Sequence, residues 1–164
     1  MFQPHAMLLL LILAVLGTPA FSTETYYGTK TGTHFCTSVP EGQNLTGIRM
    51  YVRNSNIMGM QMQHGGNWGL LYGYSDGNPL ELILGDDESV MSVYGTYGYY
   101  IQQLILSTTR PRDMYFGNTR AKNEFADSPQ NPSHELLGFC GYYVRGGLRA
   151  VLPKWGSPGG SCKE

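Results

Sequence analysis

The chain has 164 residues, of which 11 are Lys or Arg and 12 are Asp or Glu, so its net charge is −1. This length accommodates one domain with a substantial core. The near-neutral charge excludes a general nucleic-acid binder, which would carry a strong basic excess. Glycine (22 residues) is nearly twice as frequent as the usual ~7 %, and there are 12 tyrosines, a composition typical of many short strands joined by tight turns.

The first segment has the pattern of a secretory signal. Residues 8–16 form an apolar run that is too short to cross a bilayer, which takes about 20 residues. Small residues follow at the positions that a signal peptidase reads, so we expect cleavage after Ser22, with Ala20 as the alternative. We therefore predict a signal peptide over residues 1–22, a secreted product and no membrane span in the remainder.

Secretion places three cysteines in an oxidising compartment. We favour a Cys36–Cys140 disulfide, because Cys162 lies in a Gly-, Pro- and Ser-rich tail, residues 156–164, that we expect to be flexible. Cys162 would then be capped or would link two molecules into a dimer. Asn44 begins an Asn-Leu-Thr sequon and is the predicted glycosylation site.

Hydrophobic residues alternate with period two, which predicts half-buried strands, and no segment convincingly predicts a helix. Residues 48, 50 and 52 alternate with Arg49, Tyr51 and Arg53, and residues 80, 82 and 84 repeat the pattern. Met58, Met60 and Met62 are expected to fill the core rather than to bind a metal. Turn-forming residues separate these segments at 54–56, 64–67, 75–79, 85–87 and 128–132. Strands at this spacing predict a sandwich, a barrel or a prism.

Three patterns suggest chemistry, and each has a simpler explanation. Residues 73–77 match G-x-S-x-G, but Ser75 is followed by Asn-Pro and another strand, so we predict a turn rather than a hydrolase nucleophile. Residues 86–88 are three consecutive acids without the alternating spacing of an EF-type calcium loop, so we predict an acidic turn. The remaining histidines are far apart and are expected to be surface or packing residues: His34, His64 and His134.

Aromatic and basic residues on turns are the candidates for ligand binding. Sugars are held by loop backbone and polar side chains, often beside an aromatic face. We expect the tyrosines of residues 94–100 mostly to cover sheet faces, whereas Tyr142 and Tyr143 precede Arg145. Guanidinium groups have the geometry to bind sulfate or a sialic acid carboxylate. The basic groups are Arg110, Arg112, Arg120 and Lys122, and then Arg145, Arg149 and Lys154.

Residues 85–109, GDDESVMSVYGTYGYYIQQLILSTT, resemble the central signature of the jacalin-related lectins. That signature has a Gly, an acidic turn, a strand leading to V-x-G with an aromatic, and an I-x-x-L strand that ends in Thr. Residues 47–54, the Trp-Gly turn at 68–69, residues 114–117 and a final strand ending at Trp155 follow the family order. The similarity covers about residues 26–155 and is strongest to the mammalian zymogen-granule branch, including its salivary members.

The resemblance implies an all-β fold, a β-prism of three four-stranded antiparallel sheets with pseudo-threefold symmetry, over residues 23–155. It implies a non-enzymatic protein without a cofactor, whose sugar site lies at one end of the prism. It also places Cys36 and Cys140 in one sheet, the first in its first strand and the second in its final strand. In the chain-entropy model such a bridge stabilises by ~4–5 kcal/mol.

The sequence departs from the family at both sugar-binding loops. The glycine-rich first loop reads Gly-Thr-Lys-Thr-Gly over residues 28–32, and of the family's run of three glycines only Gly32 is kept. In the G-x-x-x-D loop, the glycine is replaced by Arg145 and the aspartate by Arg149. Because arginine has no hydrogen-bond acceptor, it cannot replace the carboxylate that holds mannose, so we predict weak mannose binding or none.

Charge reversal favours an anionic partner: a sialylated, sulfated or bacterial surface glycan or glycoprotein. The alternative is a secreted signalling or matrix protein that has lost sugar recognition and binds a protein. The predicted carbohydrate-binding residues are Lys30, Gly32, Arg110, Arg112, Asp113, Tyr143, Arg145, Gly146, Gly147 and Arg149.

Overall fold

The structure is a computed structural model that describes residues 24–160 of the chain. These residues form thirteen strands, and no helix lies among them. The predicted signal peptide and Cys162 lie outside the described residues. Within residues 24–160 the structure contains no helix of the length and apolarity that a bilayer crossing requires.

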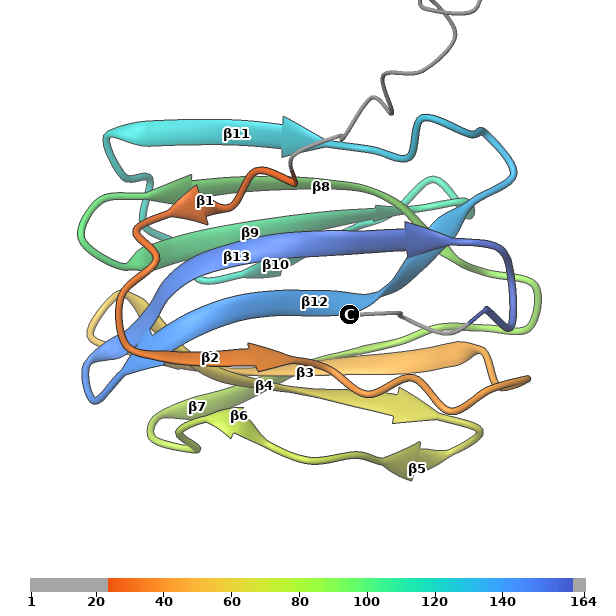
Figure 1. Cartoon of the computed structure of the whole chain (residues 1–164), viewed down its shortest axis with the longest axis horizontal. Coiled ribbons are helices and arrows are strands. Elements are labelled where there is room, and N and C mark those ends of the chain that lie inside the picture. Colours follow the sequence, from red (N-terminus) through yellow and green to blue (C-terminus); the bar gives the residue numbers. More distant parts are fainter. Residues whose placement is uncertain (1–23, 161–164) are drawn as a thin grey trace, which may run out of the picture.

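Three antiparallel sheets make up the fold (Figure 1). The terminal sheet has the order β1 (Tyr27–Gly28), β13 (Gly147–Gly156), β12 (Glu135–Val144), β2 (Thr33–Cys36). The central sheet has the order β10 (Asp113–Phe116), β9 (Ile101–Thr108), β8 (Val90–Tyr97), β11 (Asn123–Asp127). The methionine sheet has the order β5 (Asn67–Trp68), β4 (Asn56–His64), β3 (Leu45–Arg53), β7 (Asn78–Ile83), and β6 (Tyr72–Gly73) also pairs with β4.

The predicted all-β fold of three antiparallel sheets is confirmed, with one difference in strand number. The methionine sheet has five strands rather than four, because β6 pairs with β4 through Gly59–Gly73 and Met60–Tyr72. The final strand also continues to Gly156, one residue beyond the predicted domain end at Trp155, and the Gly42 N–H then donates to the Gly159 carbonyl.

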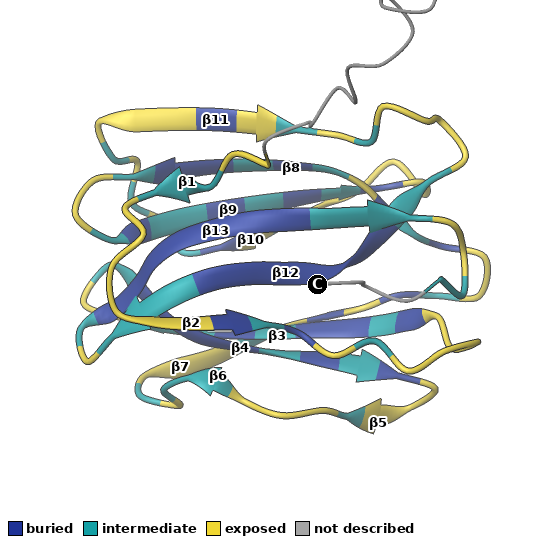
Figure 2. Cartoon of the chain, in the orientation of Figure 1, coloured by how far each residue is buried: buried dark blue, intermediate teal, exposed yellow. Residues whose placement is uncertain are grey.

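One hydrophobic core fills the space between the sheets (Figure 2). The predicted alternation is confirmed in β3 and in most of β4: Ile48, Met50 and Met60 are fully buried. Met58 is also buried, with 5 % of its surface exposed, but it lies outside the main core cluster. A register shift next to the β3–β4 turn pairs Val52 with Ile57, so Ile57 joins that cluster.

The predicted disulfide is confirmed. Cys36 in β2 and Cys140 in β12 are direct partners across the two strands, their Cα atoms are 3.9 Å apart, and their sulfurs are bonded. The two strands differ from those expected, because β2 is the second strand and β12 is the last but one. Asn44 is exposed immediately before β3, and its glycosylation stays a prediction.

Breaking the disulfide should destabilise the fold. The bridge closes a separation of 104 residues, so its removal allows a much larger unfolded ensemble. We expect a Cys36→Ser, Cys140→Ser double variant to lose about 2–5 kcal/mol of unfolding free energy, measured by urea unfolding. A loss below about 1 kcal/mol would show that the bridge is not a principal constraint.

Candidate functional site

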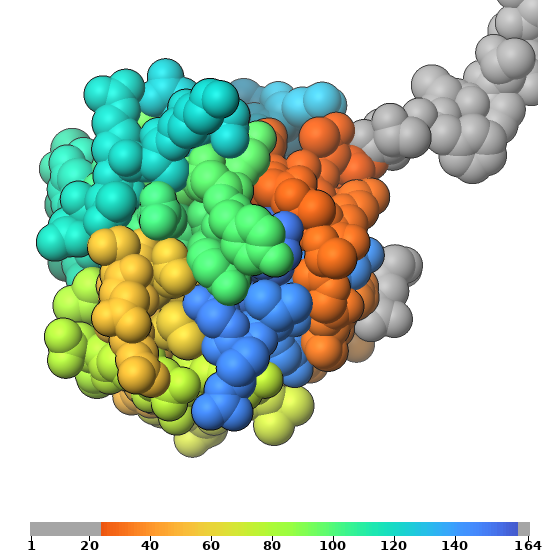
Figure 3. Space-filling model, turned by 90° about the vertical axis from the view of Figure 1, so that its left-hand side faces the viewer, coloured from red at the N-terminus to blue at the C-terminus, as the bar shows by residue number. Residues whose placement is uncertain are grey.

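Four connections meet at one end of the prism, which we call the four-turn end: residues 29–32, 54–55, 98–100 and 145–146. The Asn56 side chain joins two of them, since its amide donates to the Gly146 carbonyl at 3.3 Å and its oxygen accepts from Gln102. Figure 3 views this end, where the segment near residue 100 (green) lies against the β12–β13 turn (blue), beside the β1–β2 connection (orange). This end contains the two loops that the resemblance assigns to sugar binding.

Arg149 in β13 is the central side chain of the four-turn end. It is only 7 % exposed, and its guanidinium carbon lies 3.6 Å from the centroid of the Tyr99 ring and 5.9 Å from that of Tyr100. Tyr99 itself is 67 % exposed, so it covers the guanidinium from the solvent side. Within residues 24–160, Arg149 Nε is buried and has no hydrogen-bond partner. Stacking on an aromatic ring stabilises the cation but accepts none of its N–H groups.

The β1–β2 connection lies beside Arg149. The Thr29 N–H donates to the Arg149 carbonyl at 2.9 Å. Gly32 has a φ of 105°, and a Cβ there would lie 2.3 Å from the Tyr143 carbonyl oxygen, so this glycine is required by contact with β12. Lys30 is exposed, with its ammonium 4.8 Å from the centroid of the Tyr26 ring. Its charge is therefore available at the rim of the four-turn end.

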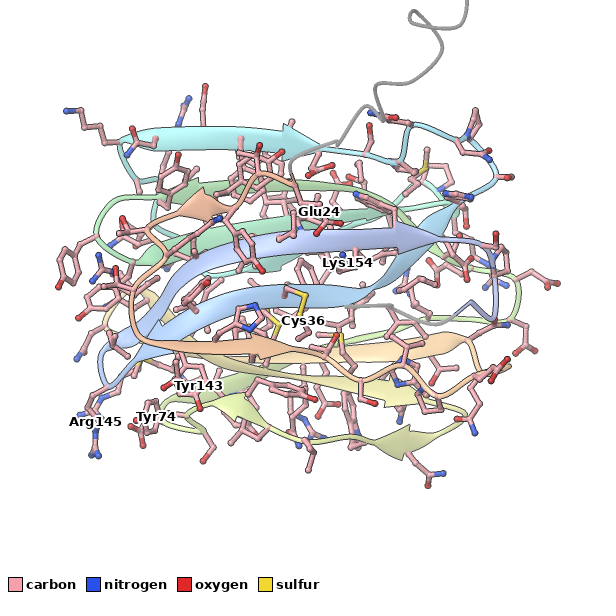
Figure 4. All side chains as sticks on the ribbon, in the orientation of Figure 1. Glu24, Cys36, Tyr74, Tyr143, Arg145 and Lys154 are labelled. Atoms are coloured by element: carbon pink, nitrogen blue, oxygen red, sulfur yellow. A yellow bond between two sulfur atoms is a disulfide. The ribbon has the colours of Figure 1, made fainter. Side chains whose placement is uncertain are left out.

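The β12–β13 turn contributes a second exposed cation. Arg145 lies at the turn, with its guanidinium carbon 5.4 Å from the centroid of Tyr74, which in turn contacts Tyr143 edge-on (Figure 4). A Cβ on Gly146 would lie 2.2 Å from the Tyr100 hydroxyl, and Gly147 has a φ of 134°. Gly147 is therefore favoured by its backbone conformation, and Gly146 allows the Tyr100 hydroxyl to approach the turn closely.

A cleft of about 280 Å³ lies next to this turn. Arg53 and Arg145 line it together with Asp76, Asn56 and Tyr100. The Asp76 carboxylate is 3.7 Å from Arg53, so its charge is already partly neutralised. The rim of the four-turn end therefore carries more positive than negative groups in the described part of the chain.

The structure separates Arg110, Arg112 and Asp113 from the other predicted site residues. In the β8–β9 hairpin, Tyr97 pairs with Ile101 at the four-turn end, whereas Val90 pairs with Thr108 at the opposite end. The three residues follow Thr108 and so lie at that opposite end. The expectation of one site that unites them with Arg149 is therefore wrong, because sequence proximity could not reveal which end of the hairpin each basic group occupies.

Arg112 is committed to a structural ion pair at this opposite end. Its guanidinium donates from Nε and Nη2 to the two oxygens of Glu88, both at 2.7 Å. Glu88 is buried and also accepts from the Thr108 hydroxyl and the Gly85 N–H. The Arg112 hydrogen bonds, with those from Thr108 and Gly85, lower the pKa of Glu88 to about 2 against the cost of burial.

The side chains of Arg110 and Asp113, which flank Arg112, also form hydrogen bonds within the fold. Arg110 donates to the Asp86 carbonyl, and the Asp113 carboxylate accepts from Ser107 at 2.6 Å. These contacts hold the 85–88 and 109–113 connections together. Residues 85–88 form the predicted acidic turn, closed by the Glu88 N–H and the Gly85 carbonyl at 3.1 Å.

The tyrosines of residues 94–100 divide into two groups. Tyr94 donates to Glu124 at 2.7 Å and Tyr97 packs on the core, as expected for residues that cover a sheet. Tyr99 and Tyr100 instead lie at the hairpin tip over Arg149, which the sequence interpretation missed. A signal was present, because Gly98 between aromatic residues marks the tip of the hairpin.

The G-x-S-x-G motif of residues 73–77 lies at a connection between two strands. Ser75 lies in the connection from β6 to β7, which joins two strands and not a strand and a helix. Among the residues that the structure describes, no group of three or more His, Cys, Asp or Glu side chains could hold a metal ion.

Comparison with known proteins agrees with this geometry. Residues 27–151 match the Jacalin-like lectin domain. The chain belongs to the jacalin-like lectin family. It is 31 % identical to prostatic spermine-binding protein of Mus musculus over 92 % of this chain and 76 % of that protein. It is 30 % identical to zymogen granule membrane protein 16 of Rattus norvegicus over 83 % of this chain and 81 % of that protein. The match to the spermine-binding protein of Rattus norvegicus spans only 41 % of that protein's length.

Solved structures show the same fold. A prostate-specific glycoprotein lectin superposes with a TM-score of 0.73 at 31 % identity, over 80 % of this chain and 96 % of that one. The artocarpin–mannotriose complex superposes with a TM-score of 0.66 at 16 % identity, over 82 % and 99 % of the two chains, which is evidence for the fold alone. The family and its fold support carbohydrate binding by a non-enzymatic protein.

The Glu88–Arg112 pair predicts a defined acid sensitivity. Because the folded-state pKa of Glu88 is about 2, below the ordinary 4.5, its contribution is complete above pH 4.5 and is lost as the pH falls from 4.5 to 2. We expect urea unfolding between pH 6 and pH 2 to show a loss smaller by up to about 3 kcal/mol in Glu88→Gln than in the parent. Parallel losses in the two proteins would contradict a stabilising role for this carboxylate.

Proposed function

We propose that this protein is a secreted, non-enzymatic lectin of exocrine fluid such as saliva, and that it binds anionic glycans at the four-turn end in preference to mannose. The observation that carries the proposal is Arg149, a buried cation at the family's sugar end with an unsatisfied N–H and no carboxylate partner in the described part of the chain. A buried charge without a counter-charge is costly, so a bound anion would be favoured there.

The chemistry of Arg149 selects an acceptor. Sulfate and carboxylate oxygens can accept two parallel, charge-assisted N–H bonds from one guanidinium. A neutral sugar hydroxyl can also accept an N–H bond, but without that charge assistance, and its own hydrogen finds no acceptor on Arg149. The Tyr99 ring covers one face of the Arg149 guanidinium. The N–H bonds of the guanidinium point outward in its own plane. A ligand is therefore expected to approach the edge of Arg149, with Tyr99 as one wall.

Exposed cations around this site would attract the same ligands. Lys30 and Arg145 are both exposed at the rim, on the two connections that hold the family's sugar loops. Their attraction acts over about 8–10 Å at physiological ionic strength and increases the encounter rate. Sulfated, sialylated and bacterial surface glycans carry the charges that this rim would recognise.

The spermine named for one relative does not suit the four-turn end. Spermine is a polycation, and Lys30, Arg145 and Arg149 would repel it. We therefore expect no competition between spermine and an anionic glycan for this end of the molecule.

A protein partner is the second candidate. Tyr99 is a large aromatic residue that is 67 % exposed at a hairpin tip, and tyrosine is enriched at the centres of protein interfaces. A secreted signalling or matrix protein on this fold could use the same tip without sugar recognition. Competition by a soluble glycan distinguishes the two candidates.

Secretion is supported by two observations: the domain contains a disulfide, and the relatives include a zymogen granule protein and a prostatic protein. It is also what the predicted signal peptide of residues 1–22 implies. Glycosylation at Asn44 and a dimer through Cys162 are further expectations for the secreted form.

A glycan array tests the proposal with variants of matched charge. The parent should bind sulfated or sialylated glycans, and binding should weaken as salt is raised from 50 to 500 mM. Arg149→Met should weaken that binding by about 10- to 100-fold, because a charge-assisted pair contributes roughly 1.5–3 kcal/mol.

Arg110→Met is the control, since it removes the same charge at the opposite end and should leave glycan binding unchanged. Thermal unfolding of each variant separates a lost contact from a lost fold. If the folded parent bound none of the glycans, or if the two variants lost glycan binding equally, the proposal would be contradicted and a protein partner favoured.

A further inference from the structure

A second groove, of about 410 Å³, lies far from the four-turn end. It is bounded by the β2–β3 connection on one side and by residues of β4, β5 and the segment up to β6 on the other. His64 and Asn67 mark its position, because His64 pairs with Leu45 at one end of the β3–β4 hairpin and the Arg53–Asn56 pair lies at the other. The groove and the Arg149 site are therefore spatially separate.

The lining of this groove is neutral and mixed. Its eleven residues include no Asp, Glu, Lys or Arg, in contrast to the cationic rim around Arg149. Met62, Trp68, Leu70 and Tyr72 form an apolar wall, and Leu70 is 72 % exposed. A ligand that fits must therefore be uncharged and must present apolar surface as well as polar groups.

Polar side chains along the groove have unused hydrogen-bonding capacity. Ser38, Gln43 and Asn67 are exposed, and within residues 24–160 none of their side chains makes a hydrogen bond. The backbone N–H of Ser38 is already satisfied, because it donates to the Tyr72 hydroxyl at 3.2 Å, and this contact fixes the two walls relative to each other. The free side chains offer both donors and acceptors to a ligand with several hydroxyl groups.

His64 provides an independent indication of a ligand. It lines the groove, is only 4 % exposed, and its Nε2 has no hydrogen-bond partner among the described residues. Burial lowers the pKa of His64. Whichever ring nitrogen carries the proton, Nε2 is a buried polar atom without a partner among the described residues, an arrangement that costs about 1–3 kcal/mol.

We propose that this groove is a second saccharide site, which binds a neutral sugar whose hydroxyl group forms a hydrogen bond with His64 Nε2 while its ring packs against the apolar wall. The volume suits one or two hexose units, since ligand pockets of about 300–1,000 Å³ hold small molecules. The site does not depend on anion binding at Arg149. One molecule could then hold a neutral and a charged part of the same glycan, or link two glycans.

Titration of the ¹⁵N-labelled, disulfide-bonded protein with maltose, cellobiose, lactose, mannobiose and diacetylchitobiose tests the site by NMR. At least one of these sugars should shift the His64 Nε2 and Trp68 indole signals. The Trp155 indole, which donates to Asp127 elsewhere, should stay fixed as an internal reference. The Arg149→Met variant should bind that sugar as the parent does, which separates this site from the proposed anionic one.

Three exposed residues supply variants that should fold. Asn67→Ala and Gln43→Ala should each weaken binding about fivefold, the effect of roughly one net hydrogen bond. Leu70→Ala should weaken it by a similar factor through lost apolar contact. Met91→Ala, an exposed apolar residue on β8, is the matched control and should have no effect. Shifts confined to the four-turn end, no shift with any of the five sugars, or equal affinity in the groove variants would overturn the proposal.

Discussion

A single hydrophobic core shared by three antiparallel sheets constrains every other feature of the molecule. Because each sheet buries one face in that core, its hairpins run the length of the prism and their turns emerge only at the two ends. The turns at residues 54–55, 98–100 and 145–146 are therefore brought together by packing, without any sequence relationship among them. The Cys36–Cys140 bridge links the edge strand β2 to β12 within this arrangement and so holds the connection of residues 29–32, which precedes β2, against the terminal sheet.

The two ends of the prism use arginine in opposite ways. At one end Arg112 is saturated by Glu88, and the pair stabilises the fold. At the other end, the β12–β13 pairing and the stacked Tyr99 ring hold Arg149 in place. Its buried Nε–H, however, has no hydrogen-bond acceptor among the described residues. The difference between the paired Arg112 and the unpaired Arg149 therefore lies in which of them has a carboxylate at hydrogen-bonding distance, and not in local sequence.

The features that could be predicted from the sequence are those that depend on the period-two alternation of hydrophobic residues and on the cysteine positions. Alternation located the buried faces of Ile48, Met50 and Leu82, and cysteine chemistry located the disulfide. The sequence-based predictions were wrong where pairing between distant strands determines the position of a residue. A register shift brought Ile57 into the main core cluster, which alternation did not predict. Arg110 and Arg112 lie at the end opposite to Arg149, because their positions along the chain carry no information on hairpin direction. His64 could be recognised as buried and unsatisfied only once β4 and the β2–β3 connection were placed together.

The Nε–H signal of Arg149, followed by ¹H–¹⁵N NMR during titration with a sulfated disaccharide, shows whether an anion binds at the four-turn end. This group is buried and lacks an acceptor within residues 24–160, so a bound sulfate oxygen would supply its missing partner. We expect the Arg149 Nε–H resonance to shift and to exchange more slowly with water as the disaccharide is added, while that of Arg112, already paired with Glu88, stays unchanged. An unchanged Arg149 signal at saturating disaccharide would contradict anion binding at Arg149.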